Sequence, residues 1–180
     1  MESEPRIPSV PDEQLGPPDV VQAIRKRRGG TLLNLDRMLL NSPAFAVGWN
    51  TFLGAVRNAL SLDPRLRELA ICAVAVVNRA EYEWLQHAPE FLAAGGTQRQ
   101  LEALRDVEAA SWDMNCFNAT ERAVLELSLE MCRNVQVSED CFERVQQHLG
   151  GTQQVVELVG VIAAYNMVSR FLEALQVQPE

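Results

Sequence analysis

The residues best suited to chemistry are Glu83 and His87, which lie four positions apart. Residues at this spacing share one face of a helix, so the carboxylate and the imidazole can form a hydrogen bond. A neighbouring carboxylate raises the pKa of an imidazole toward or above neutrality, which allows the pair to exchange protons near pH 7. The spacing predicts general acid–base catalysis. The alternative is an ordinary solvated helix face, where such pairs are common.

A second carboxylate, Glu68, precedes a run of nine apolar residues from Leu69 to Val77. A helix that is apolar on all sides is buried, either within the subunit or at a subunit contact. Because the link to the next helix is short, we expect the two helices to be antiparallel and Glu68, Glu83 and His87 to converge on one pocket. The alternative for Glu68 is a solvated charge in a first helical turn, where the helix dipole favours it.

Three neighbouring residues are predicted to line this pocket: Cys72, Tyr82 and Trp84. Cys72 follows Glu68 by about one helical turn, although its apolar surroundings also suit an inert buried thiol. Tyr82 and Trp84 flank Glu83, and such aromatic side chains are also common in cores and interfaces.

The composition excludes several classes of function. The four cysteines show no C-x-x-C spacing and the chain has two histidines, so no zinc site is predicted. A formal net charge of −8 argues against a nucleic-acid partner. No apolar run approaches the roughly 18 residues of a membrane span, and the acidic N-terminus lacks the apolar segment of a signal peptide. We therefore expect a cytoplasmic protein with a small-molecule substrate, no metal, no cofactor and no membrane contact.

Helices are the elements that must position these residues. Residues 1–18 contain five prolines and are predicted to form an extended or disordered arm. Residues 19–180 are long enough to bury a core and are predicted to form one all-α domain. Apolar periodicity and capping patterns predict helices over residues 19–28, 34–41, 43–60, 64–78, 80–94, 98–110, 119–133, 139–149 and 152–175.

A short repeat divides the helical region. The sequence Gly-Gly-Thr-Gln at residues 95–98 recurs at residues 150–153, which is 55 residues later. Each copy ends one pair of helices and begins another helix. Helix-capping chemistry or chance can also produce such an echo. At this offset the three candidate ionisable residues fall opposite Ala123, Ser138 and Phe142.

Three segments together resemble the carboxymuconolactone decarboxylase family, which includes alkylhydroperoxidase D and its relatives. They are residues 64–71 (PRLRELAI), 82–87 (YEWLQH) and 93–95 (AAG), within a motif core over residues 64–105. The resemblance implies an all-α, alkylhydroperoxidase D-like helical bundle with a central helical hairpin. It also implies a homo-oligomer, for which a dimer, trimer or hexamer is expected.

The resemblance separates two chemistries. The peroxidase branch of the family carries a Glu and then a C-x-x-C-x-x-x-H motif, whose two thiols cycle through a disulfide. Aligned from Glu68, its cysteine positions correspond to Ala80 and Glu83 in this chain, and its histidine corresponds to His87. Both redox cysteines are missing. Thiol peroxidase chemistry needs a thiolate and a resolving partner, so the pattern argues against it.

The decarboxylase branch keeps a Glu-x-x-x-His arrangement, which Glu83 and His87 reproduce. The resemblance then implies a cofactor-independent carboxy-lyase acting on a small carboxylated lactone or β-keto-acid-like substrate. His87 would donate the proton, Glu83 would orient and charge His87, and Glu68 would assist or position the substrate. One alternative is an alkylhydroperoxidase-like antioxidant activity that uses Cys72 or a more distant cysteine. The other is a non-catalytic ligand-binding or scaffold oligomer.

Overall fold

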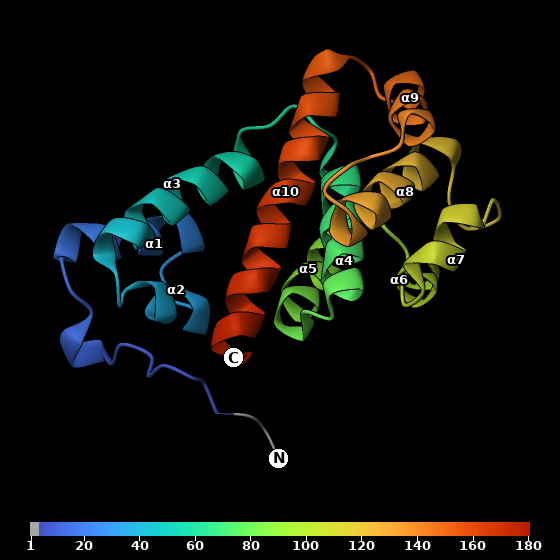
Figure 1. Ribbon diagram of the computed structural model, residues 1–180. Coiled ribbons are helices and arrows are strands. Elements are labelled where there is room, and N and C mark those ends of the chain that lie inside the picture. Colours follow the sequence, from blue (N-terminus) through green and yellow to red (C-terminus); the bar gives the residue numbers. More distant parts are fainter. Residues whose placement is uncertain (1–3) are drawn as a thin grey trace. The chain divides into compact units, whose positions relative to one another are not determined.

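The computed structural model describes residues 4–180, so the first three residues of the predicted arm lie outside it. Within the described residues the regular elements are helices, with no strand, and the all-α prediction is confirmed (Figure 1). In chain order they are η1 (Asp12–Gln14), α1 (Pro18–Arg28), α2 (Asn34–Leu39), α3 (Pro43–Asn58), α4 (Pro64–Asn78), α5 (Glu81–Ala93), α6 (Gln98–Ala103), α7 (Val107–Trp112), α8 (Ala119–Arg133), α9 (Glu139–His148) and α10 (Thr152–Leu175).

Side-chain caps fix where several of these helices begin. Asp63, immediately before α4, accepts a hydrogen bond from a backbone N–H of the first turn at 2.7 Å. Thr97 forms the predicted capping box with Gln100, and Asn118 forms the corresponding box with Glu121. Each cap satisfies a backbone N–H that has no partner within the helix. The predicted starts of α4, α6 and α8 are therefore confirmed.

The single helix predicted over residues 98–110 is wrong, because the structure has two helices there, α6 and α7. Asp106 precedes α7, and its carboxylate accepts a hydrogen bond from the backbone N–H of Ala109 at 3.0 Å. This cap starts a new helix. The break leaves Arg105 on the link between α6 and α7.

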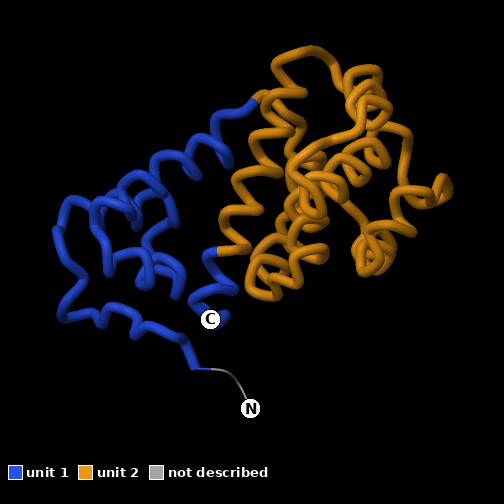
Figure 2. Tube along the Cα trace, in the orientation of Figure 1, with its two compact units in different colours: residues 1–60, 171–180 blue, residues 61–170 orange. Residues whose placement is uncertain are grey.

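The described chain divides into two compact units, coloured separately in Figure 2. One contains the residues up to Leu60 together with Phe171–Glu180, and the other contains Ser61–Arg170. The predicted arm over residues 1–18 and the predicted single domain over residues 19–180 stay predictions.

The first unit is built on α1, α2, α3 and the last residues of the chain. Asp36 of α2 is fully buried, and its carboxylate accepts a hydrogen bond from Nε of Arg28 at 2.9 Å. The rings of Trp49 and Phe171 pack with their centroids 5.1 Å apart. In the segment before α1, the backbone N–H of Arg6 donates to the carbonyl oxygen of Leu175 at 3.0 Å. The N-terminal and C-terminal segments are thus hydrogen-bonded within this unit.

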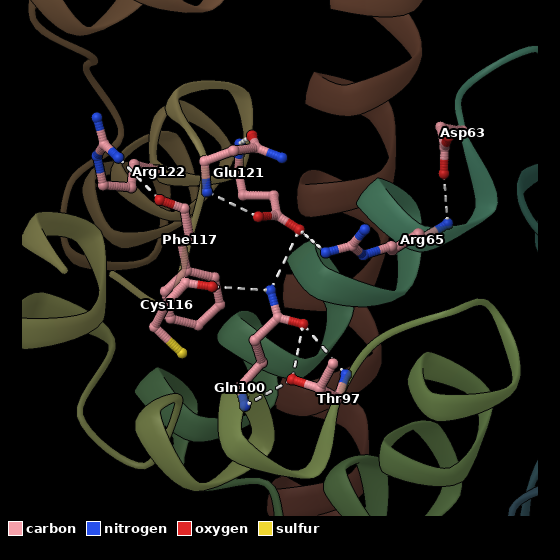
Figure 3. A network of polar contacts seen from close by, with 9 residues as sticks. Asp63, Arg65, Thr97, Gln100, Cys116, Phe117, Glu121 and Arg122 are labelled. Carbon is pink, nitrogen blue, oxygen red and sulfur yellow. Dashed lines mark hydrogen bonds and ion pairs between the residues drawn. The ribbon is translucent and has the colours of Figure 1, made fainter. Parts of the chain in front are cut away.

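The second unit is centred on α4, which packs against α5 and α8. Every residue of α4 from Glu68 to Ala75 is buried, as the apolar run predicts. A polar network joins the starts of α4, α6 and α8 (Figure 3). In it, the buried Glu121 carboxylate contacts Arg65 and accepts a hydrogen bond from Nε2 of Gln100 at 3.3 Å.

The direction of α8 relative to α4 follows from the residues that lie close together near the start and near the end of both helices. Arg65 of α4 and Glu121 of α8 meet near the start of both helices. Val77 and Leu129, near the ends of the same two helices, line one cavity. The helices therefore run in the same direction.

Helix α10 has 24 residues, and its most apolar 18-residue window has a mean hydropathy of 1.5. By length and composition alone it can cross a membrane, although core helices of soluble proteins have the same property. Of that window, 56% is buried inside the protein. Scattered polar residues interrupt its apolar runs, so a search for uninterrupted apolar stretches does not find it. Two of these polar residues, Asn166 and Ser169, are themselves buried.

Candidate active site

Glu68 and His87 form a buried pair between α4 and α5. Nδ1 of His87 lies 2.7 Å from Oε2 of Glu68, and the two residues are 5% and 1% exposed. The short link between the helices folds α5 back along α4, which brings these side chains together. The two side chains meet as expected, while the pocket beside them and their catalytic role stay predictions.

The Glu68 carboxylate has partners on both of its oxygens. Oε2 faces His87, and Oε1 accepts a hydrogen bond from Nε of Arg67 at 3.2 Å. A buried carboxylate is costly unless it is paired and hydrogen-bonded. The permanently charged guanidinium of Arg67 compensates the charge of Glu68 in either protonation state of His87.

Glu83 lies one turn before His87 on α5 and is 1% exposed. Its Oε2 lies 3.0 Å from the hydroxyl oxygen of Ser169 on α10, which is also 2.9 Å from the carbonyl oxygen of Tyr165. The sequence predicts that Glu83 orients His87. In the structure, the carboxylate at Nδ1 of His87 belongs to Glu68, and Glu83 is held by α10.

Helix α10 also contributes an aromatic neighbour to His87. The rings of His87 and Tyr165 meet edge to face, with centroids 4.9 Å apart and an interplanar angle of 85°. This contact restricts the orientation of the imidazole. Sequence reasoning missed Tyr165 and Ser169. Their spacing of four residues places them on one face of α10, and this is the signal that indicates a polar contact there.

Cys72 lies one turn after Glu68 on α4 and is fully buried. Burial is the main cause that raises the pKa of its thiol, and the negative charges of Glu68 and Glu83 raise it further. A thiol with a raised pKa is protonated at neutral pH and is a poor nucleophile.

The other two predicted pocket residues, Tyr82 and Trp84, are also buried, at 4% and 6% exposure. The guanidinium of Arg105 lies 4.0 Å from the centroid of the Trp84 ring, in a cation–π contact. Trp84 thus connects α5 to the link between α6 and α7. The roles of both residues as substrate contacts stay predictions.

A group with the geometry of metal ligands lies elsewhere in the second unit. Ligand atoms of Glu126, Glu130 and Cys141 lie within 4.8 Å of one another. Glu126 pairs with Arg144, with one contact at 2.8 Å, and Glu130 accepts a hydrogen bond from the backbone N–H of Ser138 at 2.7 Å. Both carboxylates therefore have protein partners that position α9.

The model of the carboxymuconolactone decarboxylase family matches residues 43–127, a range that contains Glu68, Glu83 and His87. Residues 43–127 are thus similar to this family, and we call them the family segment. The resemblance inferred from the motif core at residues 64–105 is thereby confirmed.

Solved structures similar to the whole chain place the family segment in an alkylhydroperoxidase D-like fold. A peroxidase-related protein from Ralstonia eutropha, described as an alkylhydroperoxidase AhpD core, has 19% identity and a TM-score of 0.81, covering 100% of this chain and 94% of its own. A peroxidase-related protein from Silicibacter has 18% identity and a TM-score of 0.79, covering 99% and 95%. The debrominase Bmp8 has 14% identity and a TM-score of 0.76, covering 91% and 87%. A search of curated proteins gives no match.

Proposed function

We propose that this protein is a cofactor-independent decarboxylase that acts by acid–base catalysis on a small carboxylated lactone or β-keto acid. The observation that carries the proposal is the buried contact of 2.7 Å between Nδ1 of His87 and Oε2 of Glu68. Glu83, one turn away on α5, supplies a second buried carboxylate. The family segment at residues 43–127 contains all three residues and supports the same chemistry.

In the proposed reaction, the carbon–carbon bond to the substrate carboxylate breaks and CO₂ leaves. The electron pair of that bond is delocalised into the conjugated carbonyl group of the substrate. Protonated His87 then delivers its proton from Nε2 to the substrate carbon and regains one from solvent. Glu68, bound at Nδ1, fixes the imidazole ring and stabilises its charged form. Glu83, anchored by Ser169, orients the substrate in the site.

The descriptions of the two peroxidase-related neighbours favour an antioxidant activity as the second candidate. In this chain that activity requires Cys72 or a more distant cysteine, because Ala80 and Glu83 occupy the redox positions. Burial and two carboxylates raise the pKa of Cys72, which suppresses its thiolate. A thiol titration before and after treatment with cumene hydroperoxide separates the candidates. We expect four free thiols in both cases, and a loss of thiols on treatment would favour the peroxidase.

The burial of the three ionisable residues also fits a non-catalytic scaffold, whose polar groups only satisfy one another. We further propose that the protein is cytoplasmic and forms a homo-oligomer. The observation that supports the assembly is the exposure of Phe45 and Phe52 on α3, at 48% and 47%, which suits a subunit contact. Light scattering coupled to size-exclusion chromatography tests the assembly. A monomer over the working concentration range would contradict it.

Release of CO₂ from a panel of carboxylated lactones and β-keto acids tests the enzyme directly. The matched variants are Glu83→Gln and His87→Gln, which keep the size of each side chain close to the original. Loss of general acid–base catalysis is expected to lower kcat by about 100-fold or more. Far-UV circular dichroism and thermal unfolding must show that both variants fold. If both folded variants turn over substrate like the wild type, the proposed roles are wrong.

A further inference from the structure

A cavity of about 460 Å³ in the second unit lies where α4 and α8 end, next to the link between α6 and α7. Its apolar lining includes Val77, Val107 and Leu129. Its charged lining includes three arginines, one from each of these elements: Arg79, Arg105 and Arg133. We call this cavity the arginine cleft. It combines an apolar surface with several cationic donors.

The three arginines of the cleft differ in their partners. Arg133 is paired with Glu108, with an N···O distance of 2.8 Å. Arg105 lies over the ring of Trp84, which leaves its positive charge without a carboxylate partner among the described residues. Arg79 is exposed and forms no ion pair or side-chain hydrogen bond with the described residues. Two positive charges at the cleft are thus available to an anion.

The backbone at Arg79 has a conformation that is uncommon for a residue with a side chain. Arg79 ends α4 in the left-handed region, with φ 57° and ψ 35°. Glycine adopts this conformation without steric cost, whereas a side chain is strained there. Such strain is concentrated at functional sites, where the side chain itself is needed.

The wall of the arginine cleft contacts α10, the helix that also contacts Glu83. Asn78 and Cys132 both line the cleft. Asn78 donates a hydrogen bond to Oδ1 of Asn166 at 3.0 Å, and Nδ2 of Asn166 lies 3.4 Å from the sulfur of Cys132. Asn166 precedes Ser169, the partner of Glu83, by one turn.

We propose that the arginine cleft binds a small organic acid, with Arg79 and Arg105 contacting its carboxylate and the apolar lining contacting its hydrocarbon part. Guanidinium groups suit this role because their paired N–H donors match the two oxygens of a carboxylate. Of the two carboxylates at the cleft, Glu108 is paired with Arg133, whereas Asp106 caps α7 and keeps its negative charge. With three arginines and two carboxylates, the lining still carries a net positive charge. The inference rests on the proposed function in one respect, namely that the substrate is itself a carboxylate. Beyond that function, the inference names Arg79 and Arg105 as the residues that recognise the carboxylate of the substrate.

Binding can be measured without turnover by following the tryptophan indole N–H signals in ¹H–¹⁵N NMR spectra. The chain has three tryptophans, and Trp84→Phe assigns the one beneath Arg105. Benzoate is expected to shift the Trp84 signal along a saturable curve, while the signals of Trp49 and Trp112 stay in place. Benzamide, which has the same ring without the charge, and inorganic phosphate, which has charge without an apolar part, are expected to bind at least tenfold more weakly. Equal binding of either would overturn the proposal.

Two variants test the arginines directly. Arg79→Gly removes the guanidinium and suits the left-handed backbone, and Arg105→Gln removes the second free charge. Each is expected to weaken benzoate binding at least tenfold. Arg99→Gln, at an exposed position of α6 outside the cleft, changes the net charge equally and is expected to bind like the wild type. Wild-type affinity in both cleft variants would overturn the assignment.

A third variant separates this inference from the proposed function. His87→Gln is expected to abolish turnover and to leave benzoate binding unchanged. If benzoate binds as expected but no substrate of the panel is turned over, the proposed reaction is wrong and the proposed binding at the cleft is supported. If turnover occurs while Arg79→Gly and Arg105→Gln leave both benzoate binding and KM unchanged, the proposed binding at the cleft is wrong and the proposed reaction is supported.

Discussion

The two helical hairpins of the second unit, α4–α5 and α8–α9, share one construction and differ in their buried side chains. Helices α4 and α8 each have 15 residues and follow capping side chains, Asp63 and Asn118, that are 55 residues apart. Helices α5 and α9 each lead into a Gly-Gly-Thr sequence with the same offset. The helix boundaries thus agree with the repeat inferred from residues 95–98 and 150–153.

The difference lies in the ionisable residues. Glu68 and His87 are buried in the first hairpin, whereas Ala123 and Phe142 occupy the corresponding positions in the second. A buried ionic pair is often no more stable than apolar side chains of similar volume, because its desolvation offsets its attraction. The second hairpin shows that this construction forms without such a pair. The comparison therefore favours chemistry, not stability, as the reason for the pair in the first hairpin.

The largest expected effect comes from breaking the pair on one side only. Glu68→Ala leaves His87 and Arg67 without the buried carboxylate, and we expect the free energy of unfolding to fall by about 3–5 kcal/mol. The double variant Glu68→Met with His87→Leu makes the first hairpin apolar like the second. Its free energy of unfolding, measured by urea titration, is expected to lie within about 1–2 kcal/mol of the wild-type value. A double variant less stable than Glu68→Ala would show that the pair serves the fold.

Replacing the glycines that follow the two hairpins by alanine is expected to have a smaller effect on the free energy of unfolding. A Cβ at Gly96 would lie 2.4 Å from the ring of Phe91, which is fully buried, so Gly96→Ala is expected to cost about 1–3 kcal/mol. In the second copy, a Cβ at Gly150 would meet only the end of the Gln154 side chain, at 3.1 Å. Gly150→Ala is therefore expected to change stability by about 0.5 kcal/mol or less. Equal losses of thermal stability in the two variants would contradict this contrast.

Each hairpin also contains one fully buried thiol, Cys72 in α4 and Cys141 in α9. Burial raises the pKa of both thiols from 9.0, that of Cys141 to about 12. The folded protein keeps these protons while the unfolded chain loses them, so the stabilisation is complete below about pH 9 and is lost as pH rises toward the folded pKa. Above pH 9 we expect the free energy of unfolding to fall by up to about 1.4 kcal/mol per pH unit for each thiol.

Urea titrations at about pH 8, 10 and 11 measure this slope. Cys141→Ala and Cys72→Ala are each expected to make it shallower, and the double variant shallower still. An unchanged slope in the double variant would assign the alkaline loss of stability to other groups.

Most of the fold was predictable because its signals are local. Proline at the first position of α4, the capping boxes at Thr97 and Asn118, and the apolar run after Glu68 each act within one or two helical turns. The break at Asp106 was missed because a capping aspartate inside an amphipathic pattern resembles an ordinary polar position. Whether such an aspartate starts a new helix depends on the tertiary packing of the residues that follow it.

The candidate site was predictable only in part. The spacing of Glu83 and His87 and the short link after α4 were sufficient to predict that Glu68 and His87 converge. The partner at Nδ1 depends on how α4 and α5 pack, and the contacts of Tyr165 and Ser169 depend on α10, about 80 residues further along the chain. Contacts over such distances in sequence are set by tertiary packing and leave little local pattern.

The most direct test of the central claim is the position of the proton that His87 is proposed to deliver. A carboxylated, conjugated lactone is decarboxylated in D₂O, and the product is analysed by NMR. The wild-type protein is expected to place one deuterium on a single face of the product carbon, and His87→Gln is expected to form no product above the uncatalysed rate. Stereospecific deuterium incorporation at the wild-type rate by folded His87→Gln would contradict acid–base catalysis at this residue.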